Sequence, residues 1–306
     1  MTGNLSLHEF IDRCCLLFVF MALQTPLLIS QVVNFSATVD NLQIPKTLDT
    51  VHSPFFSPVV FGSSMLLGGL AIHYWRYTPL WHDYKTSFFV KENFTYALNQ
   101  DKLLHFYGAS LGASLLSSTY EVAGIEPTSS EVYGIAGAAL LLSLVEVEDG
   151  HISYLGFDRS DFAADLAGAF YSLAQRQVPL LRSFTPKMSY HTSGRNVTVS
   201  GQRLSGKLGD HEGQTFWLGI TVQDLLPVQW QSFWPSMLGI AVGRGVAGLD
   251  TDQPNAFVLV GLDIDLRKLP ASSPWLRRVW NILNYIRMPL PTVKISHGTV
   301  WYGLYF

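Results

Sequence analysis

Charged side chains are scarce in this chain, and their scarcity limits the classes of protein to which it can belong. Only 14% of its 306 residues are Asp, Glu, Lys or Arg, whereas 48% are hydrophobic. An average soluble domain carries roughly a quarter charged residues. Because the hydrophobic content is high, a disordered chain, a collagen and a long solvated coiled coil are excluded. The composition favours a membrane-associated envelope protein with one or two domains and a sizeable core.

The net charge limits the partners that the protein can bind, and the positions of the cysteines limit the disulfides that it can form. The formal net charge is −3, so no basic excess is present to bind a phosphate backbone, and nucleic acid is not expected as a partner. Membrane lipid is the expected partner. Cys14 and Cys15 are the only cysteines, and because they are adjacent they cannot form an ordinary disulfide between distant segments.

The first 54 residues have the features of a targeting segment and a linker. Residues 14–29 are apolar except for Gln24 and Thr25 and follow a single Arg13. This pattern predicts a secretory signal peptide within residues 1–30, with an uncleaved N-terminal anchor as the alternative. No lipobox-like pattern precedes Cys14, so no lipid anchor is predicted. Residues 31–54 are polar and irregular and are expected to form a linker.

Residues 55–180 are expected to form a helical domain. Residues 55–75 are nearly uncharged and are either a membrane span or a buried helix of a bundle, two alternatives of equal weight. Three further helices are predicted at residues 99–122, 130–149 and 159–178. Small residues recur in them, including Gly108 and Gly112 in a GxxxG pattern, so the helices can approach one another closely. A compact bundle lying against a membrane, or partly immersed in it, fits these short apolar runs better than regular transmembrane helices.

Residues 181–306 are expected to form a β-rich region. Segments rich in β-branched, aromatic and glycine residues are separated by turn signals there, which predicts about five to seven strands. The clearest strands are at residues 215–222, 238–246, 256–266 and 300–306, and short helices are expected at 225–234 and 275–287. Asp263 and Asp265 alternate along one strand and are expected to face solvent. The fold class is therefore α+β, a small-residue helical bundle followed by a β-rich C-terminal part.

Several acidic residues and one histidine of the helical domain lie near the ends of the predicted helices. Asp101 and His105 are four residues apart and share a helix face, as do Glu146 and Asp149 at the end of the next helix. Asp158 is placed to cap the third helix, with two further acids in its first turns. If these faces meet, six residues form one polar cluster: Asp101, His105, Glu146, Asp149, Asp161 and Asp165.

Five carboxylates in an apolar setting require neutralisation, because burying an unpaired carboxylate costs many kcal/mol. The candidates are His105 itself, Lys102, Arg159, His151, protonation of one or two acids, or a divalent cation. No metal-binding motif such as HExxH is present, and the sequence identifies no cofactor. Two roles stay open for the cluster: capping helices and holding the bundle together, or forming an acid/base or metal-binding site.

The motifs of this cluster resemble those of the YfiM-like family of bacterial envelope proteins, often described as predicted periplasmic lipoproteins, in its longer Bacteroidetes-type form. Residues 101–105 are similar to the family's DKxxH, residues 146–150 to its ExxDG and residues 156–168 to its GFSxxDxxANxxG. Asp158 stands where the family favours Ser, and Asp165 stands where long-form members favour Asn.

The resemblance continues beyond the helices. Residues 209–218, 240–245 and 261–266 are similar to family segments, so the likeness extends over about residues 60–306. The helical motifs are also similar to those of VanZ-like membrane proteins, which share a DKxxH start and an acidic third helix.

The family resemblance implies a location in the bacterial cell envelope but no established reaction. We expect a protein on the periplasmic side, associated with the outer membrane, with the inner membrane as the alternative. The expected role is structural or lipid-handling. The alternative role is an enzyme that modifies an envelope lipid or glycan, with His105 as acid/base and Asp101, Glu146 and Asp161 as ligands or partners.

Overall fold

The computed structural model describes the C-terminal three quarters of the chain almost completely. The described residues are 84–92, 94–194, 209–296 and 298–306, with further positions at 64, 67–69, 71, 198–199 and 202–203. The chain divides into two units, Met1–Asp83 and Tyr84–Phe306, and the second unit contains all the elements named below. The predicted signal peptide or anchor and the predicted linker lie outside the described residues, as does almost all of the segment 55–75.

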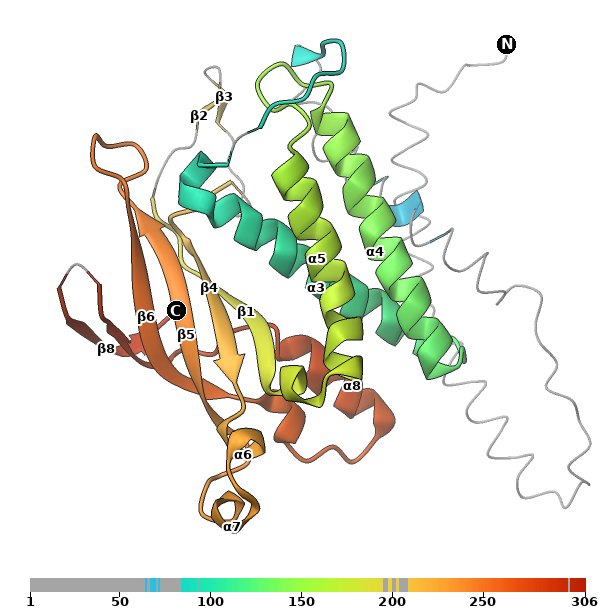
Figure 1. Cartoon of the computed structure of the whole chain (residues 1–306), viewed down its shortest axis with the longest axis vertical. Coiled ribbons are helices and arrows are strands. Elements are labelled where there is room, and N and C mark those ends of the chain that lie inside the picture. The colour runs from blue at the N-terminus through green and yellow to red at the C-terminus, as the bar shows by residue number, and fades with distance from the viewer. Residues whose placement is uncertain are drawn as a thin grey trace, which may run out of the picture. The chain divides into compact units, whose positions relative to one another are not determined.

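Three long helices form one side of the second unit: α3 (Gln100–Val122), α4 (Pro127–Asp149) and α5 (Arg159–Gln177). Helix α3 packs against both of the others (Figure 1). Helix α4 begins where the Glu126 side chain accepts a 3.0 Å hydrogen bond from the backbone N–H of Ser129, and α5 begins where Asp158 accepts one from Ser160 at 2.7 Å. Such caps satisfy N–H groups that lack a partner in the first turn. The three predicted helices are confirmed to within three residues at each end.

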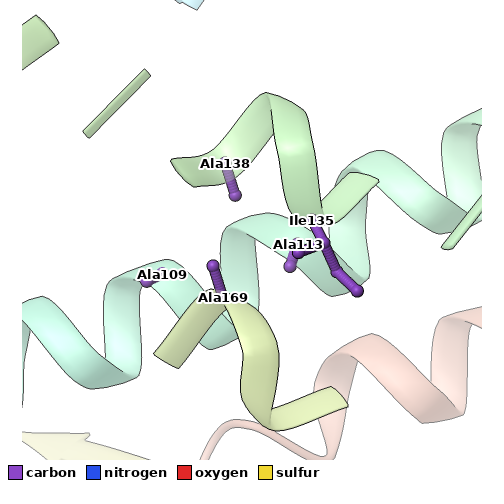
Figure 2. Close-up of a cluster of buried hydrophobic side chains, with 5 residues drawn as sticks. All are labelled: Ala109, Ala113, Ile135, Ala138 and Ala169. Carbon is purple, nitrogen blue, oxygen red and sulfur yellow. The ribbon is translucent and has the colours of Figure 1, made fainter. Parts of the chain in front are cut away.

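Small side chains make the core of this helical layer. The buried cluster consists of Ala109 and Ala113 from α3, Ile135 and Ala138 from α4, and Ala169 from α5, and Figure 2 shows these side chains at the crossing of the helices. Four of the five are alanines, so the three backbones lie close together. Close packing of small residues therefore positions the helix ends that carry the polar residues.

The closest approaches lie at two glycines outside the predicted GxxxG pair. A Cβ atom on Gly168 would overlap the carbonyl oxygen of Phe106 in α3, and one on Gly134 would overlap Ser117 of α3. By contrast, a Cβ on Gly108 would meet nothing within 4 Å, and one on Gly112 would make only an ordinary 3.7 Å contact. The absence of a side chain thus matters most at Gly134 and Gly168, which let α4 and α5 approach α3.

A six-stranded antiparallel sheet forms the rest of the unit, and it confirms the α+β class. Its strands are β1 (Phe184–Tyr190), β4 (Gln214–Ile220), β5 (Leu238–Ala247), β6 (Asn255–Ile264), β7 (Leu290–Lys294) and β8 (Val300–Tyr305). They lie side by side in this order (Figure 1). A separate two-stranded ladder joins β2 (Thr198–Val199) to β3 (Gln202–Arg203).

Short helices occupy the connections. They are η3 (Tyr96–Asn99), η4 (Pro179–Ser183), α6 (Val222–Leu225), α7 (Val228–Gln231), η5 (Leu266–Lys268) and α8 (Pro274–Leu283). Helices α6 and α7 replace the single short helix expected at 225–234, and α8 ends four residues before the predicted 287.

The sheet has two different faces. Met188 and Phe216 pack with Tyr107 of α3 and with Tyr285, so this face meets the helical layer. Neighbouring residues of a strand point to opposite faces, and Trp217 accordingly joins Leu259 and Tyr305 in a cluster on the other face.

The expectation that Asp263 and Asp265 face solvent is wrong, because both side chains are buried. Lys187 of β1, only 1% exposed, places its Nζ 2.8 Å from Asp263 Oδ2 and also donates to the carbonyl oxygen of Ile264 and to Asn284 Oδ1. Asp265 accepts a 2.6 Å hydrogen bond from Thr221 and pairs with a neighbouring arginine. Alternation along a strand does not reveal which face is covered, and the positive charge that pairs with Asp263 comes from a distant strand.

Two polar contacts attach the start of α3 to the sheet. Gln100, the first residue of the helix, donates from Nε2 to the carbonyl oxygen of Gln214 at 2.8 Å and accepts at Oε1 a 3.0 Å hydrogen bond from Arg244. Gln100 is fully buried. The next residue is Asp101, so the sheet fixes the position of the helix turn that begins the polar cluster.

Candidate functional site

The three helices bring their polar ends to one place. Asp101 and His105 lie in the first turns of α3, Glu146 lies in the last turn of α4, and Asp161 and Asp165 lie in the first two turns of α5. Each of the four carboxylates has an oxygen within 4.0 Å of a ring nitrogen of His105. Five of the six residues singled out from the sequence therefore meet around one imidazole.

His105 has carboxylates at both of its ring nitrogens. Nδ1 lies 3.0 Å from Asp165 Oδ1 and 3.6 Å from Glu146 Oε1. On the other side of the ring, Nε2 lies 3.9 Å from Asp101 Oδ1 and 4.0 Å from Asp161 Oδ1. Only the 3.0 Å contact has the length of a hydrogen bond. The imidazole is thus held from the Nδ1 side and more loosely surrounded on the Nε2 side.

Asp149, the sixth residue, lies at the edge of the cluster. It ends α4, and its backbone carbonyl accepts hydrogen bonds from the N–H groups of Ile152 and Gly156, which hold the loop that leads to α5. Its negative charge raises the pKa of Glu146. Asp149 therefore contributes to the electrostatics of the cluster and to the loop, while the other four carboxylates contribute the contacts with His105.

Lys102 supplies a fixed positive charge to one side of the cluster. Its Nζ lies 2.8 Å from Asp161 Oδ1 and 3.0 Å from Asp158 Oδ2, with Asp101 at 4.0 Å. The other two basic residues considered from the sequence lie elsewhere. Arg159 pairs at the surface with Glu92, 3.0 Å away, and His151 is exposed and packs against the ring of Phe88.

His211 is a neighbour of the cluster that the sequence pattern did not reveal. It lies in the turn before β4, its side chain is buried, and its Nε2 lies 3.9 Å from Asp101 Oδ1. The ring of Tyr96 meets it edge to face at 5.5 Å. No local spacing links residue 211 to residue 101, so only the tertiary fold could reveal this approach.

The surrounding charges strongly shift the pKa of His105 and of Glu146. Burial alone would lower the pKa of His105, but the hydrogen bond to Asp165 and the negative charges of Asp165, Asp101 and Asp161 raise it to about 10. Burial raises the pKa of Glu146 to about 8. The charge of His105 acts to lower this pKa, and the charges of the nearby carboxylates act to raise it. At neutral pH the metal-free cluster therefore holds an imidazolium ion and a largely protonated Glu146.

The α5 carboxylates and Lys102 are shifted by the same environment. Burial, followed by repulsion from Asp101, raises the pKa of Asp161 to about 6, and burial also raises the pKa of Asp165. Burial would raise the pKa of Asp158, but hydrogen bonds from Ser160 and Lys102 lower it to about 2. Burial opposes the charge of Lys102, yet its bond and attraction to Asp161 leave its pKa raised. Such strongly shifted groups gather at functional sites more often than elsewhere.

Two overlapping sets of donor atoms in this cluster have the spacing of metal ligands. One set is Asp101, His105 and Asp161, and the other is His105, Glu146 and Asp165; in each, the three atoms lie within 4.8 Å of one another. The first set shares Asp161 with Lys102. Imidazole and carboxylate together suit ions such as Zn²⁺ and Mn²⁺.

A family model matches the helical part of the chain. Residues 88–176 match the family model described as "Predicted periplasmic lipoprotein (DUF2279)". Comparisons with curated proteins and with solved structures found no match. The matched range contains all six cluster residues. The match supports an uncharacterised envelope family, on the periplasmic side, and its description states no reaction. The cysteines of this chain, Cys14 and Cys15, lie outside the described residues.

Proposed function

We propose that this envelope protein is associated with a membrane and handles lipid, and that helix α4 contacts the lipid along one face. The observation that supports the proposal is the uncovered apolar surface of α4. Within the described residues, α4 is the one helix long and apolar enough to cross a membrane, and only 33% of its most apolar 18-residue window is buried. A core helix of a soluble bundle would be mostly covered.

The large exposed apolar side chains of α4 form a single stripe. At 100° per residue they fall within about a third of the helix circumference, and they are Val132, Tyr133, Leu140, Leu144 and Val147, each 40–53% exposed. The charged residues Glu131 and Glu146 lie on the buried side. A helix of this kind can lie against the apolar part of a bilayer with its polar residues turned toward the protein.

The polar cluster lies at the C-terminal end of α4, behind the stripe. Glu146 lies in the last turn of α4 and is 2% exposed, whereas Leu144 and Val147, close to it in sequence, are 40% and 44% exposed. If the stripe rests on lipid, His105 and its carboxylates lie on the side of α4 that faces the protein. We assign the contact to the periplasmic side of the outer membrane, with the inner membrane as the alternative.

Matched fluorescent labels test lipid contact by α4. Leu144 of α4 and Leu262 of β6 are equally exposed, at 40% each. In full-length protein with Cys14 and Cys15 replaced by Ser, a fluorophore on Leu144→Cys should be quenched by brominated lipid in phosphatidylethanolamine–phosphatidylglycerol vesicles, whereas one on Leu262→Cys should not. Because the readout is local, membrane binding by another segment does not obscure it. Absence of quenching at position 144, or quenching at position 262 alone, would contradict the proposal.

A second candidate function is an enzyme that modifies an envelope lipid or glycan. The observation that favours it is that four carboxylates from three helices converge on the imidazole of His105. They are Asp101, Glu146, Asp161 and Asp165. Full-length protein incubated with an envelope lipid extract or with peptidoglycan should then change the mass of a component, and the His105→Ala variant should not. An unchanged mass spectrum with wild-type protein in both incubations would reject this candidate.

A further inference from the structure

The polar cluster has two unequal sides. On one side, Lys102 pairs with Asp161 and Asp158 at 2.8 and 3.0 Å, so a fixed cation balances those carboxylates. On the other side, Glu146 and Asp165 face the Nδ1 atom of His105. No lysine or arginine of the described residues pairs with either of these two carboxylates. The second side therefore lacks a permanent positive charge.

The burial of these two carboxylates makes that lack costly. Asp165 is 0% exposed and Glu146 is 2% exposed. Asp165 Oδ2 is buried and has no hydrogen-bond partner among the described residues, and the contact of Glu146 with His105 is 3.6 Å, longer than a hydrogen bond. Leaving a buried acceptor unsatisfied costs about 1–3 kcal/mol, and more when it is charged. With Glu146 protonated, the imidazolium balances the charge of Asp165 alone, whereas a divalent cation that displaced the protons of His105 Nδ1 and Glu146 would balance both carboxylates.

The spacing of the donor atoms suits an ion. His105 Nδ1 lies 3.0 Å from Asp165 Oδ1 and 3.6 Å from Glu146 Oε1. Two ligand atoms that each lie about 2.0–2.2 Å from a common ion are separated by roughly 2.8–3.6 Å in tetrahedral or octahedral geometry. The three donors come from three helices, and Gly168 and the alanine core fix how those helices pack. The site is thus built on rigid elements rather than on a loop.

We propose that His105 Nδ1, Glu146 and Asp165 bind one divalent transition-metal ion of the Zn²⁺ or Mn²⁺ class. Three protein ligands leave positions for water or for an oxygen of a ligand. The alternative set on the Nε2 side is less suitable, because its distances to His105 are 3.9 and 4.0 Å and Lys102 already neutralises Asp161. The proposal does not depend on lipid contact by α4.

Metal titration of full-length protein in detergent tests the site. Without a purification tag, and after treatment with a chelator, the wild type should bind about one Mn²⁺ per chain, measured by loss of the free Mn²⁺ electron paramagnetic resonance signal, and Zn²⁺ should compete. Glu146→Gln and Asp165→Asn each keep the side-chain shape but remove a charged ligand. Each should weaken Mn²⁺ binding at least tenfold, since even residues that only hydrogen-bond to a metal ligand change the metal affinity by roughly 10–100-fold when they are replaced.

Asp161→Asn is the matched control. It changes a carboxylate that lies 4.0 Å from His105 Nε2 and pairs with Lys102, so the Mn²⁺ affinity should change less in this variant than in the other two. Circular dichroism and thermal unfolding establish that each variant is folded. Failure of the folded wild type to bind Mn²⁺ or Zn²⁺ saturably would overturn the proposal, as would unchanged affinity in folded Glu146→Gln and Asp165→Asn.

Discussion

Replacing Lys187 by alanine is expected to lower the free energy of unfolding by about 3–5 kcal/mol, because one partner of a buried ion pair is removed and Asp263 keeps only Arg287, whose Nε lies 3.8 Å from Asp263 Oδ1. Lys187 is the largest fully buried side chain in the described part of the protein, and its Nζ contacts Asp263 Oδ2, Asn284 Oδ1 and the carbonyl oxygen of Ile264. Burial lowers the pKa of Lys187, although the charge of Asp263 opposes this effect. Chemical denaturation monitored by tryptophan fluorescence measures the loss.

An exposed pair of nearly the same length provides the control for Lys187. Lys268 Nζ lies 2.7 Å from Asp224 Oδ1, but both side chains are about a third exposed. Lys268→Ala should cost at most about 1 kcal/mol. Equal costs for Lys187→Ala and Lys268→Ala would show that burial does not govern the energetics of this pair.

Gly168→Ala is expected to destabilise the helical layer by about 1–3 kcal/mol, because the new methyl group overlaps a backbone atom that cannot rotate away. The clashing atom is the carbonyl oxygen of Phe106, the residue after His105. Relief of the clash must move α5 away from α3, and this movement lengthens the 3.0 Å contact between His105 and Asp165. The substitution should therefore lower the thermal unfolding temperature and also weaken binding of Mn²⁺ to the cluster.

Gly108→Ala is the matched control for Gly168→Ala. It is the same substitution in the middle of a long helix, but the added Cβ meets nothing within 4 Å. Alanine is favoured over glycine in a helix by about 0.5–1 kcal/mol, so this variant should unfold at a slightly higher temperature than the wild type. A stabilised Gly168→Ala variant would contradict the close approach of α5 to α3.

The three long helices and four strands of the six-stranded sheet follow from local patterns in the sequence, whereas the other two strands of that sheet do not. Strands β1 and β7 contain Pro186 and Pro291, and proline ordinarily argues against a strand. The structure accommodates both. β1 is at the edge of the sheet, and the pairing of β7 with β8 shifts register between Leu290 and Thr292, where Pro291 lies. Proline is tolerated at edges and at such irregularities, and neither position can be recognised before the neighbouring strands are known.

The composition of the polar cluster could be predicted because its members lie at helical spacing on three adjacent helices. Asp101 and His105 share a face by their i, i+4 spacing, as do Asp161 and Asp165. The division of the cluster could not be predicted in this way. The way in which α4 and α5 cross α3 determines which carboxylates pair with Lys102 and which carboxylates lie next to His105 Nδ1. The approach of His211 depends on how the sheet meets α3.

The central claim is that the buried side of the His105 cluster is built for a divalent cation, and diffraction from crystals of the full-length protein grown with Mn²⁺ tests it most directly. An anomalous difference map should contain a peak about 2.0–2.3 Å from His105 Nδ1 and from carboxylate oxygens of Glu146 and Asp165. A map with no peak there, and with His105 still in direct contact with Asp165, would contradict the claim and leave the cluster as an internal ion-pair network.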